Sequence, residues 1–302
     1  LRLDRPRPSH AHGDSNAGLE QRALRTSQWF QLRDVGQSPV VAREDDERPP
    51  GEVEFIERVF KKEFGRSPSF LREDFCGTAL LCSEWVKVDS AHTALGVDLD
   101  GPTLAWGKAN NIAPLGARAE AVTLIQEDVR KVTAPRADVL TATNFSWWGF
   151  KTRSELGDYL RGARECLRDE GMLMMDCYGG PEAQIPQFEE REIDGFDYVW
   201  DQDTWNPITH EIVCRIHFQF PDGSRMKNAF RYDWRLWTLP EIRDLLEDAG
   251  FSRVTVYWQG WDKDGEGIFI ATRFGDVSQI HYVAQPGGAR TQLTFFDEPI
   301  GG

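Results

Sequence analysis

The chain has 302 residues, and its 49 acidic against 35 basic side chains give a formal net charge of −14 at pH 7. This charge would repel a phosphate backbone over much of the surface, so nucleic acid is not an expected partner. The five cysteines form no C-x-x-C pair, which argues against a disulfide framework and a zinc site and favours the cytoplasm or another reducing compartment.

The N-terminal segment has no regular period. The longest apolar runs are far shorter than a bilayer span, so we expect a soluble protein without a membrane partner. Because the chain begins at Leu1 and not at Met, the question whether a targeting leader was removed stays open. We expect residues 1–28 to be a disordered tail and residues 29–68 a helical cap, because the apolar residues of 53–64 recur at helical spacing.

From residue 69 to residue 180, short apolar strands alternate with helices. This alternation predicts a parallel sheet with helices on both faces, which we expect to form the core of a Rossmann-like domain. The predicted strands are 69–75, 93–100, 121–129, 137–145 and 172–180. A capping box at Thr152 and Glu155 and a stop at Gly171 predict a helix over 153–170.

The rhythm changes after residue 180 to long strands rich in aromatic residues. We expect an antiparallel β insert over 181–237, with "PDGS" (221–224) as a hairpin turn. Aromatic strands in excess of what the core needs predict a lid over the site or the surface of a homodimer.

The C-terminal part of the core is expected over 238–285, followed by a tail at 286–302. A second capping box, at Thr238 and Glu241, predicts a helix at about 239–249. Two further strands, "RVTVYWQGW" (253–261) and "GIFIATRF" (267–274), are expected to pair through a polar turn.

The turn after the first strand, "DFCGTA" (74–79), lies where an open parallel sheet binds its ligands. Gly77 and the small Thr78 allow close approach of the backbone, and Asp98 ends the second strand, where an acid can accept ribose hydroxyls. Asp128 follows the third strand at the same edge. The three strand ends together predict a nucleotide-like ligand, whereas the turn alone would equally fit a buried corner.

These segments resemble the class I S-adenosylmethionine-dependent methyltransferases over about 69–274. "EDFCGTA" is similar to the family's D-x-G-C-G-T-G turn, with Glu73 at the acidic position and Phe75 and Ala79 in place of the outer glycines. The resemblance implies a Rossmann-like α/β fold, a mostly parallel seven-stranded sheet, and S-adenosyl-L-methionine as cofactor. The cofactor contacts that it implies are Arg72, Glu73, Phe75, Cys76, Gly77, Thr78, Asp98, Leu99, Asp128, the Val129 amide and Asn144. For Arg72, a local ion pair is an equal alternative.

The segment "TNFSWWGFKTRSELGDYLRGARECL" and the aromatic insert are similar to small-molecule N-methyltransferases that include aminosugar enzymes. "REDFCGT" resembles a family of uncharacterised bacterial methyltransferases. The fourth and fifth strands end at the cofactor edge, so Asn144 and Tyr178 are the expected catalytic residues. The expected residues around the acceptor are Trp147, Trp148, Tyr178, Trp205 and Trp237, although packing is the alternative for these rings.

The expected reaction is in-line methyl transfer to a small molecule, an amine being favoured because tryptophan faces stabilise a group that becomes cationic. A hydroxyl acceptor would need a general base, for which Tyr178, Asp176 and His217 are candidates. The substitutions at Phe75 and Ala79 keep open a methyltransferase-like binding or regulatory protein without catalysis. A nicotinamide-dependent oxidoreductase is disfavoured because G-x-G-x-x-G is absent.

Overall fold

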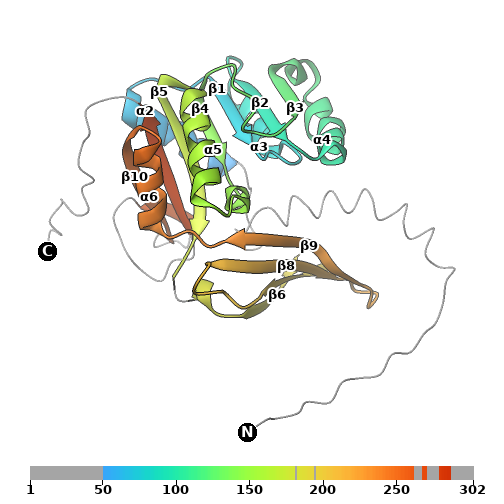
Figure 1. The fold of residues 1–302 in the computed structure, drawn as a ribbon. Coiled ribbons are helices and arrows are strands. Elements are labelled where there is room, and N and C mark those ends of the chain that lie inside the picture. The colour runs from blue at the N-terminus through green and yellow to red at the C-terminus, as the bar shows by residue number, and fades with distance from the viewer. Residues whose placement is uncertain (1–49, 181, 194, 262–266, 271–278, 287–302) are drawn as a thin grey trace, which may run out of the picture.

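The computed structural model describes residues 50–180, 182–193, 195–261, 267–270 and 279–286, which form two β-sheets with helices around the larger one (Figure 1). The larger sheet has eight strands in the order β11-β10-β12-β5-β4-β1-β2-β3. Its strands are β1 (Phe70–Asp74), β2 (Thr93–Asp98), β3 (Val122–Gln126), β4 (Ala137–Ala142), β5 (Leu167–Tyr178), β10 (Phe251–Trp261), β11 (Gly267–Ile270) and β12 (Gln279–Pro286). The five neighbouring strands β5, β4, β1, β2 and β3 are parallel, as the alternation of elements predicted.

The sheet therefore has one strand more than the seven predicted. β10 pairs with β11 as the predicted hairpin, but β11 lies at the outer edge, and β12 lies between β10 and β5. β12 ("QIHYVAQP") was not predicted, and it pairs antiparallel with the strands on both of its sides. Residues 262–266 and 271–274, which complete the predicted turn and strand, lie outside the described residues.

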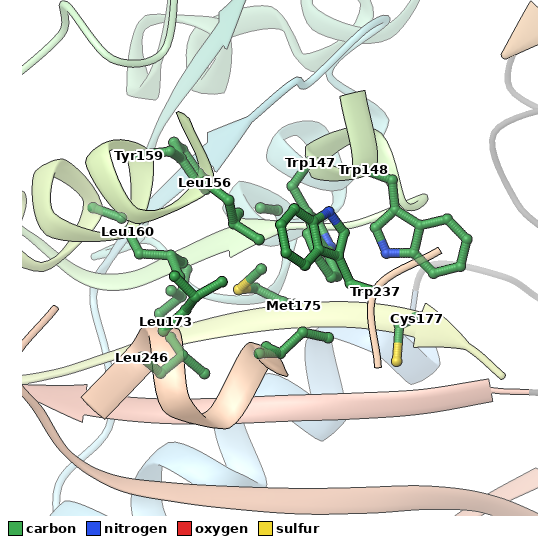
Figure 2. Packing of buried hydrophobic residues seen from close by; sticks show 14 of the residues in the cluster. Trp147, Trp148, Leu156, Tyr159, Leu160, Leu173, Met175, Cys177, Trp237 and Leu246 are labelled. Atoms are coloured by element: carbon green, nitrogen blue, oxygen red, sulfur yellow. The ribbon is translucent and has the colours of Figure 1, made fainter. Parts of the chain in front are cut away.

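Helices cover both faces of this sheet. On one face lie α2 (Pro50–Phe64) and α3 (Leu80–Val88), whose buried side chains form one core cluster with β1 and β4. On the other face, α5 (Arg153–Glu165) and α6 (Leu239–Asp248) pack against β5, as Figure 2 shows for Leu156, Leu246 and their neighbours. The shorter helices are α4 (Gly101–Gly107), η1 (Lys108–Ile112), η2 (Ala113–Ala121), η3 (Ser146–Gly149) and η4 (Glu182–Gln184).

The capping boxes predicted the starts of α5 and α6 correctly. In both, the threonine side chain accepts the glutamate N–H and the glutamate side chain accepts the threonine N–H. The end of α5 was predicted five residues too late, because the helix ends at Glu165 with Cys166 as its C-cap. Residues 167–170 belong to β5, where Leu167 pairs with Ala137 of β4, so strand pairing outweighs the helical pattern there.

The second sheet is antiparallel, with the order β6-β7-β8-β9. Its strands are β6 (Gln187–Ile193), β7 (Phe196–Gln202), β8 (Glu211–Gln219) and β9 (Arg225–Arg235). The "PDGS" turn joins β8 to β9, with Gly223 in the left-handed region. β8 and β9 contribute Ile212, Cys214 and Trp234 to the main core, so the insert is anchored to the Rossmann-like part (Figure 1).

The expected tail at 1–28, residues 29–49 of the expected cap and residues 287–302 of the expected tail at 286–302 lie outside the described residues, whereas Pro286 ends β12. Within the part of the chain that the structure describes, no helix is long and apolar enough to cross a bilayer.

Candidate functional site

The turn after β1 contains three residues in the left-handed backbone region. These are Phe75 (φ 60°), Gly77 (φ 54°) and Ala79 (φ 56°). A residue with a Cβ pays about 1–2 kcal/mol for this conformation. Phe75 and Ala79 occupy the outer glycine positions of the methyltransferase pattern, so the chain retains a glycine-like backbone without those glycines. Strain that persists at a strand end points to a functional role for the turn.

A carboxylate from the neighbouring strand fixes this turn. One oxygen of Asp98, the last residue of β2, accepts the Gly77 N–H at 2.8 Å, and the other accepts the Asp100 N–H at 2.8 Å. The Cys76 N–H donates to the Val97 carbonyl at 3.1 Å. A carboxylate has about four acceptor sites, so Asp98 retains capacity for ligand hydroxyls. The turn and Asp98 thus form one unit at the carboxyl ends of the strands.

Two glycines allow neighbouring elements to approach the turn closely. A Cβ on Gly96 of β2 would lie 2.8 Å from Cys76 Sγ, and a Cβ on Gly107 of α4 would lie 2.1 Å from the Thr78 carbonyl oxygen. Asn111 Nδ2 also donates to that carbonyl at 3.0 Å. The side chains of Cys76 and Thr78 are buried, and burial raises the pKa of the Cys76 thiol well above its ordinary value. The Cys76 side chain therefore packs the turn against β2, and the Thr78 carbonyl lies against α4.

Glu73 connects β1 to the start of α3. Its Oε2 accepts the Cys82 N–H at 3.1 Å. Burial raises the pKa of Glu73 to about 8; the Cys82 hydrogen bond opposes this shift, and the charges of Glu52 and Asp98 add to it. The carboxyl is therefore mostly protonated at neutral pH, and a cation placed beside it would favour loss of that proton.

The segments after β2 and β3 border the same edge. Leu99 is 68% exposed, which leaves an apolar surface directly beyond Asp98. Asp128 accepts hydrogen bonds from Arg130 Nε at 3.0 Å and from a terminal nitrogen at 2.6 Å, and this pairing lowers the pKa of Asp128. Val129 is buried, and its carbonyl accepts a hydrogen bond from Arg72 at 2.9 Å.

Arg72 is not directed toward a ligand. It is 1% exposed, and its Nε donates to Asp74 Oδ1 at 2.7 Å. Its terminal nitrogens donate to the carbonyls of Val132 and Val129 and to Cys166 Sγ. The alternative of a local ion pair therefore describes Arg72, and we leave it out of the proposed cofactor contacts.

The turn after β4 is held by a carboxylate from β5. Asn144 (φ 60°) and Phe145 (φ 55°) are both left-handed, and their N–H groups donate to the two oxygens of Asp176 at 2.8 and 3.0 Å. Burial raises the pKa of Asp176 to about 7, which these two hydrogen bonds oppose. Asp176 thus fixes the backbone of Asn144 at the carboxyl edge of the sheet, and its carboxyl titrates near neutral pH.

An aromatic cluster joins this edge to the second sheet. The Tyr178 ring lies 4.8 Å from the Trp148 ring and 5.0 Å from the Phe145 ring, centroid to centroid. Trp234 of β9 contacts both Trp148 and Phe145 edge-on. The Tyr178 hydroxyl donates to Gln202 of β7 at 3.2 Å, and burial raises its pKa well above the ordinary value. Tyr178 is therefore a poor general base and a link to the insert.

The other predicted tryptophans have separate roles in packing. Trp147 Nε1 donates to the Asp176 carbonyl at 2.9 Å, and Trp237 Nε1 donates to the Phe150 carbonyl at 3.1 Å. Figure 2 shows Trp147, Trp148 and Trp237 among buried apolar side chains. Trp205 lies beside His210. Among the described residues, no ring contact joins Trp205 or Trp237 to Trp148 or Tyr178.

Glu52, in the first turn of α2, was not predicted as a site residue. Its charge contributes to the raised pKa of both Glu73 and Asp176, so it lies near the edge that these acids border. The sequence offered only a weak signal, since an acid in the first turn of a helix is ordinarily explained by the helix dipole.

No protein-family model matches the sequence, and no curated protein matches it. Solved structures do. A Clostridium acetobutylicum S-adenosylmethionine-dependent methyltransferase matches at TM-score 0.63 and 14% identity, over 86% of this chain and 100% of that one. The sugar N-methyltransferase KedS8 from a Streptoalloteichus species matches at TM-score 0.54 and 16% identity, over 94% of this chain and 100% of that one. CalS10 is an amino pentose methyltransferase from Micromonospora echinaspora that was solved with bound S-adenosylmethionine. It matches at TM-score 0.56 and 15% identity, over 93% of this chain and 100% of that one.

These likenesses show that the chain shares its fold with these three methyltransferases. The residues at the strand ends fit S-adenosylmethionine in their chemistry. Asp98 has acceptor capacity for ribose hydroxyls, Leu99 offers an exposed apolar side chain, and buried carboxyls border the edge.

Proposed function

We propose that this protein is an S-adenosylmethionine-dependent methyltransferase that acts on a small molecule, an amine in particular. The observation that carries the proposal is the turn after β1, whose three left-handed residues are tied to Asp98 at the carboxyl edge of a parallel sheet. Ligands of open α/β sheets bind at this edge. Phe75 and Ala79 keep the turn in the conformation that the methyltransferase glycines favour, which argues against loss of the cofactor site.

The proposed contacts follow the strand ends. Asp98 would hold the ribose, and Leu99 together with Asp128 and the Val129 amide would hold the adenine. Gly77 and its neighbours Phe75, Cys76 and Thr78 would approach the amino-acid part through their backbone, with Glu73 below the turn. Asn144 would complete the site from β4.

When bound, S-adenosylmethionine supplies a methyl group on a positively charged sulfur, which a neutral amine can take in one in-line displacement. The chain's own work is then to bind, align and exclude water, which can lower a barrier by about 7–11 kcal/mol in the best oriented systems. Asn144 can orient an amine hydrogen through its side-chain carbonyl, and its backbone is fixed by Asp176. Asp176 accepts the N–H groups of Asn144 and Phe145 through its two oxygens, so its proposed part is to position Asn144.

The second sheet is the proposed wall of the acceptor site. Trp234 of β9 and Gln202 of β7 contact Trp148 and Tyr178, so the insert begins where the acceptor would enter. Tyr178, which is not fully buried, is the ring of this cluster proposed to face a group becoming cationic, whereas the fully buried Trp148 supports it from behind. The fold neighbours KedS8 and CalS10 are a sugar N-methyltransferase and an amino pentose methyltransferase, which supports an amine acceptor.

The test separates cofactor binding from turnover. Isothermal titration with S-adenosylhomocysteine should show one site per chain, and an acceptor screen over small amines should then yield a methylated product. Asn144→Ala should lose turnover by a much larger factor than cofactor affinity, because its side chain is proposed to orient the acceptor. Tyr178→Phe should keep both within a few-fold because the ring contacts remain. Binding without turnover on any amine, alcohol or acid would favour the regulatory alternative.

A further inference from the structure

A buried polar network lies directly beneath the proposed cofactor site and takes no part in the proposed chemistry. Its central members are Arg72 and Asp74 of β1, both 1% exposed. Tyr159 of α5 donates its hydroxyl to Asp74 Oδ2 at 3.1 Å, while Arg72 Nε donates to Asp74 Oδ1 at 2.7 Å. Both carboxylate oxygens are thus satisfied, and the direction of the guanidinium is fixed.

The free end of the guanidinium reaches the loop between β3 and β4. It donates to the Val132 carbonyl at 2.5 Å and to the Val129 carbonyl at 2.9 Å, and a further contact to Cys166 Sγ measures 2.9 Å. Arg72 therefore holds two carbonyls of a segment that has no strand pairing of its own there. The Val129 residue that it holds is the one whose amide would contact the adenine.

Stability alone is a weak reason for such a network. A buried ion pair is often no more stabilising than apolar residues of similar volume. An apolar pair at these positions could fill the same space, but it could not bond two loop carbonyls. What the ion pair adds is a fixed position for residues 129–132.

We propose that Arg72 is a positioning residue for the adenine side of the cofactor site, with Asp74 and Tyr159 as its supports. The proposal rests on the proposed function for the identity of the ligand. The same network touches the cofactor turn, because the Phe75 ring lies 5.7 Å from the Tyr159 ring. β1 thus couples the turn at its own end to the loop that follows β3.

The chain offers a matched control at the opposite end of the sheet. Asp138, also fully buried, accepts hydrogen bonds from Arg66 at 3.0 Å and Arg168 at 2.7 Å, and from the backbone of Ser69 and Phe70. Asp138→Asn should cost stability through a comparable network that lies far from the proposed ligand edge.

The experiment compares Arg72→Met/Asp74→Leu, which leaves no unpaired buried charge, with Asp138→Asn. Titration with S-adenosylhomocysteine and with 5′-methylthioadenosine, which lacks the amino-acid part, measures affinity; thermal unfolding measures stability. The double variant should weaken binding of both ligands by about fivefold or more, the factor for one lost hydrogen bond of ordinary strength, while Asp138→Asn leaves both unchanged. Arg72→Lys, which keeps the charge but cannot span two carbonyls, should behave like the double variant and serves if the latter does not fold.

Equal affinities in all variants, or equal losses in the double variant and Asp138→Asn, would overturn the positioning role. Hydrogen exchange of the unliganded protein provides an independent readout: amides of 129–132 should exchange faster in the double variant and not in Asp138→Asn. A wild-type protein that binds neither ligand would refute the proposed function, whereas unchanged exchange in the double variant would refute the anchoring of the loop.

Discussion

The contact between α4 and the cofactor turn makes Gly107 the most informative single position for a substitution. In Gly107→Ala, the new Cβ would lie 2.1 Å from the Thr78 carbonyl oxygen and 2.6 Å from its carbonyl carbon. Both are backbone atoms, so the turn and the helix must separate by roughly 1 Å. Such overpacking typically costs about 1–3 kcal/mol, of which about 1 kcal/mol is returned by the better helix propensity of alanine. We expect a net loss of stability of up to about 2 kcal/mol.

Affinity for the cofactor should fall as well. A displacement of about 1 Å breaks backbone contacts of ordinary hydrogen-bond strength, so we expect S-adenosylhomocysteine to bind about tenfold more weakly. Urea unfolding and isothermal titration measure the two effects. Gly162→Ala in α5 is the control, because its Cβ would meet nothing within 4 Å and should stabilise by about 0.5–1 kcal/mol without changing affinity. A folded Gly107→Ala protein with wild-type affinity would refute the placement of the cofactor on this turn.

Three further predictions follow from the same edge. Asp98→Asn should lose about 1–3 kcal/mol of cofactor affinity in a titration. The control, Asp100→Ala, removes the N-cap of α4 and should lower stability without changing affinity. Equal losses of affinity in the two variants would remove Asp98 from the ribose site. The pKa of Glu73 in the folded protein, about 8, exceeds its value in the unfolded chain, so the free energy of unfolding should fall as the pH rises from about 4.5 to 8. In urea unfolding, this fall should be shallower for Glu73→Gln than for the wild type. Identical pH profiles of the two proteins would contradict the raised pKa. If the insert also forms a dimer surface, light scattering should give twice the 34.4 kDa chain mass. A monomer mass would contradict the dimer surface and leave the insert only its proposed part as a wall of the acceptor site.

Local signals in the sequence predicted much of the fold. The two capping boxes fixed the starts of α5 and α6 because the interaction lies within four consecutive residues. The parallel strands followed from their apolar runs and spacing. β12 could not be predicted in this way, because its pairing with β5 joins segments about a hundred residues apart.

The site was predictable at the strand ends and less so within them. Asp98 and the turn at Gly77 lie side by side because adjacent parallel strands end at one edge. The role of Arg72 depended on carbonyls some sixty positions away, which no local pattern reveals. The left-handed conformation of Phe75 and Ala79 was equally hidden, since neither residue type favours it.

The central claim is that the turn at 75–79 and Asp98 form a site for S-adenosylmethionine. Isothermal titration of the purified chain with S-adenosylhomocysteine, and separately with NADH, tests it most directly. We predict one saturable site per chain for S-adenosylhomocysteine, lost or weakened in Asp98→Asn, and no binding of NADH. No binding of S-adenosylhomocysteine by a folded protein free of copurified ligand, or saturable binding of NADH at the same edge, would contradict it.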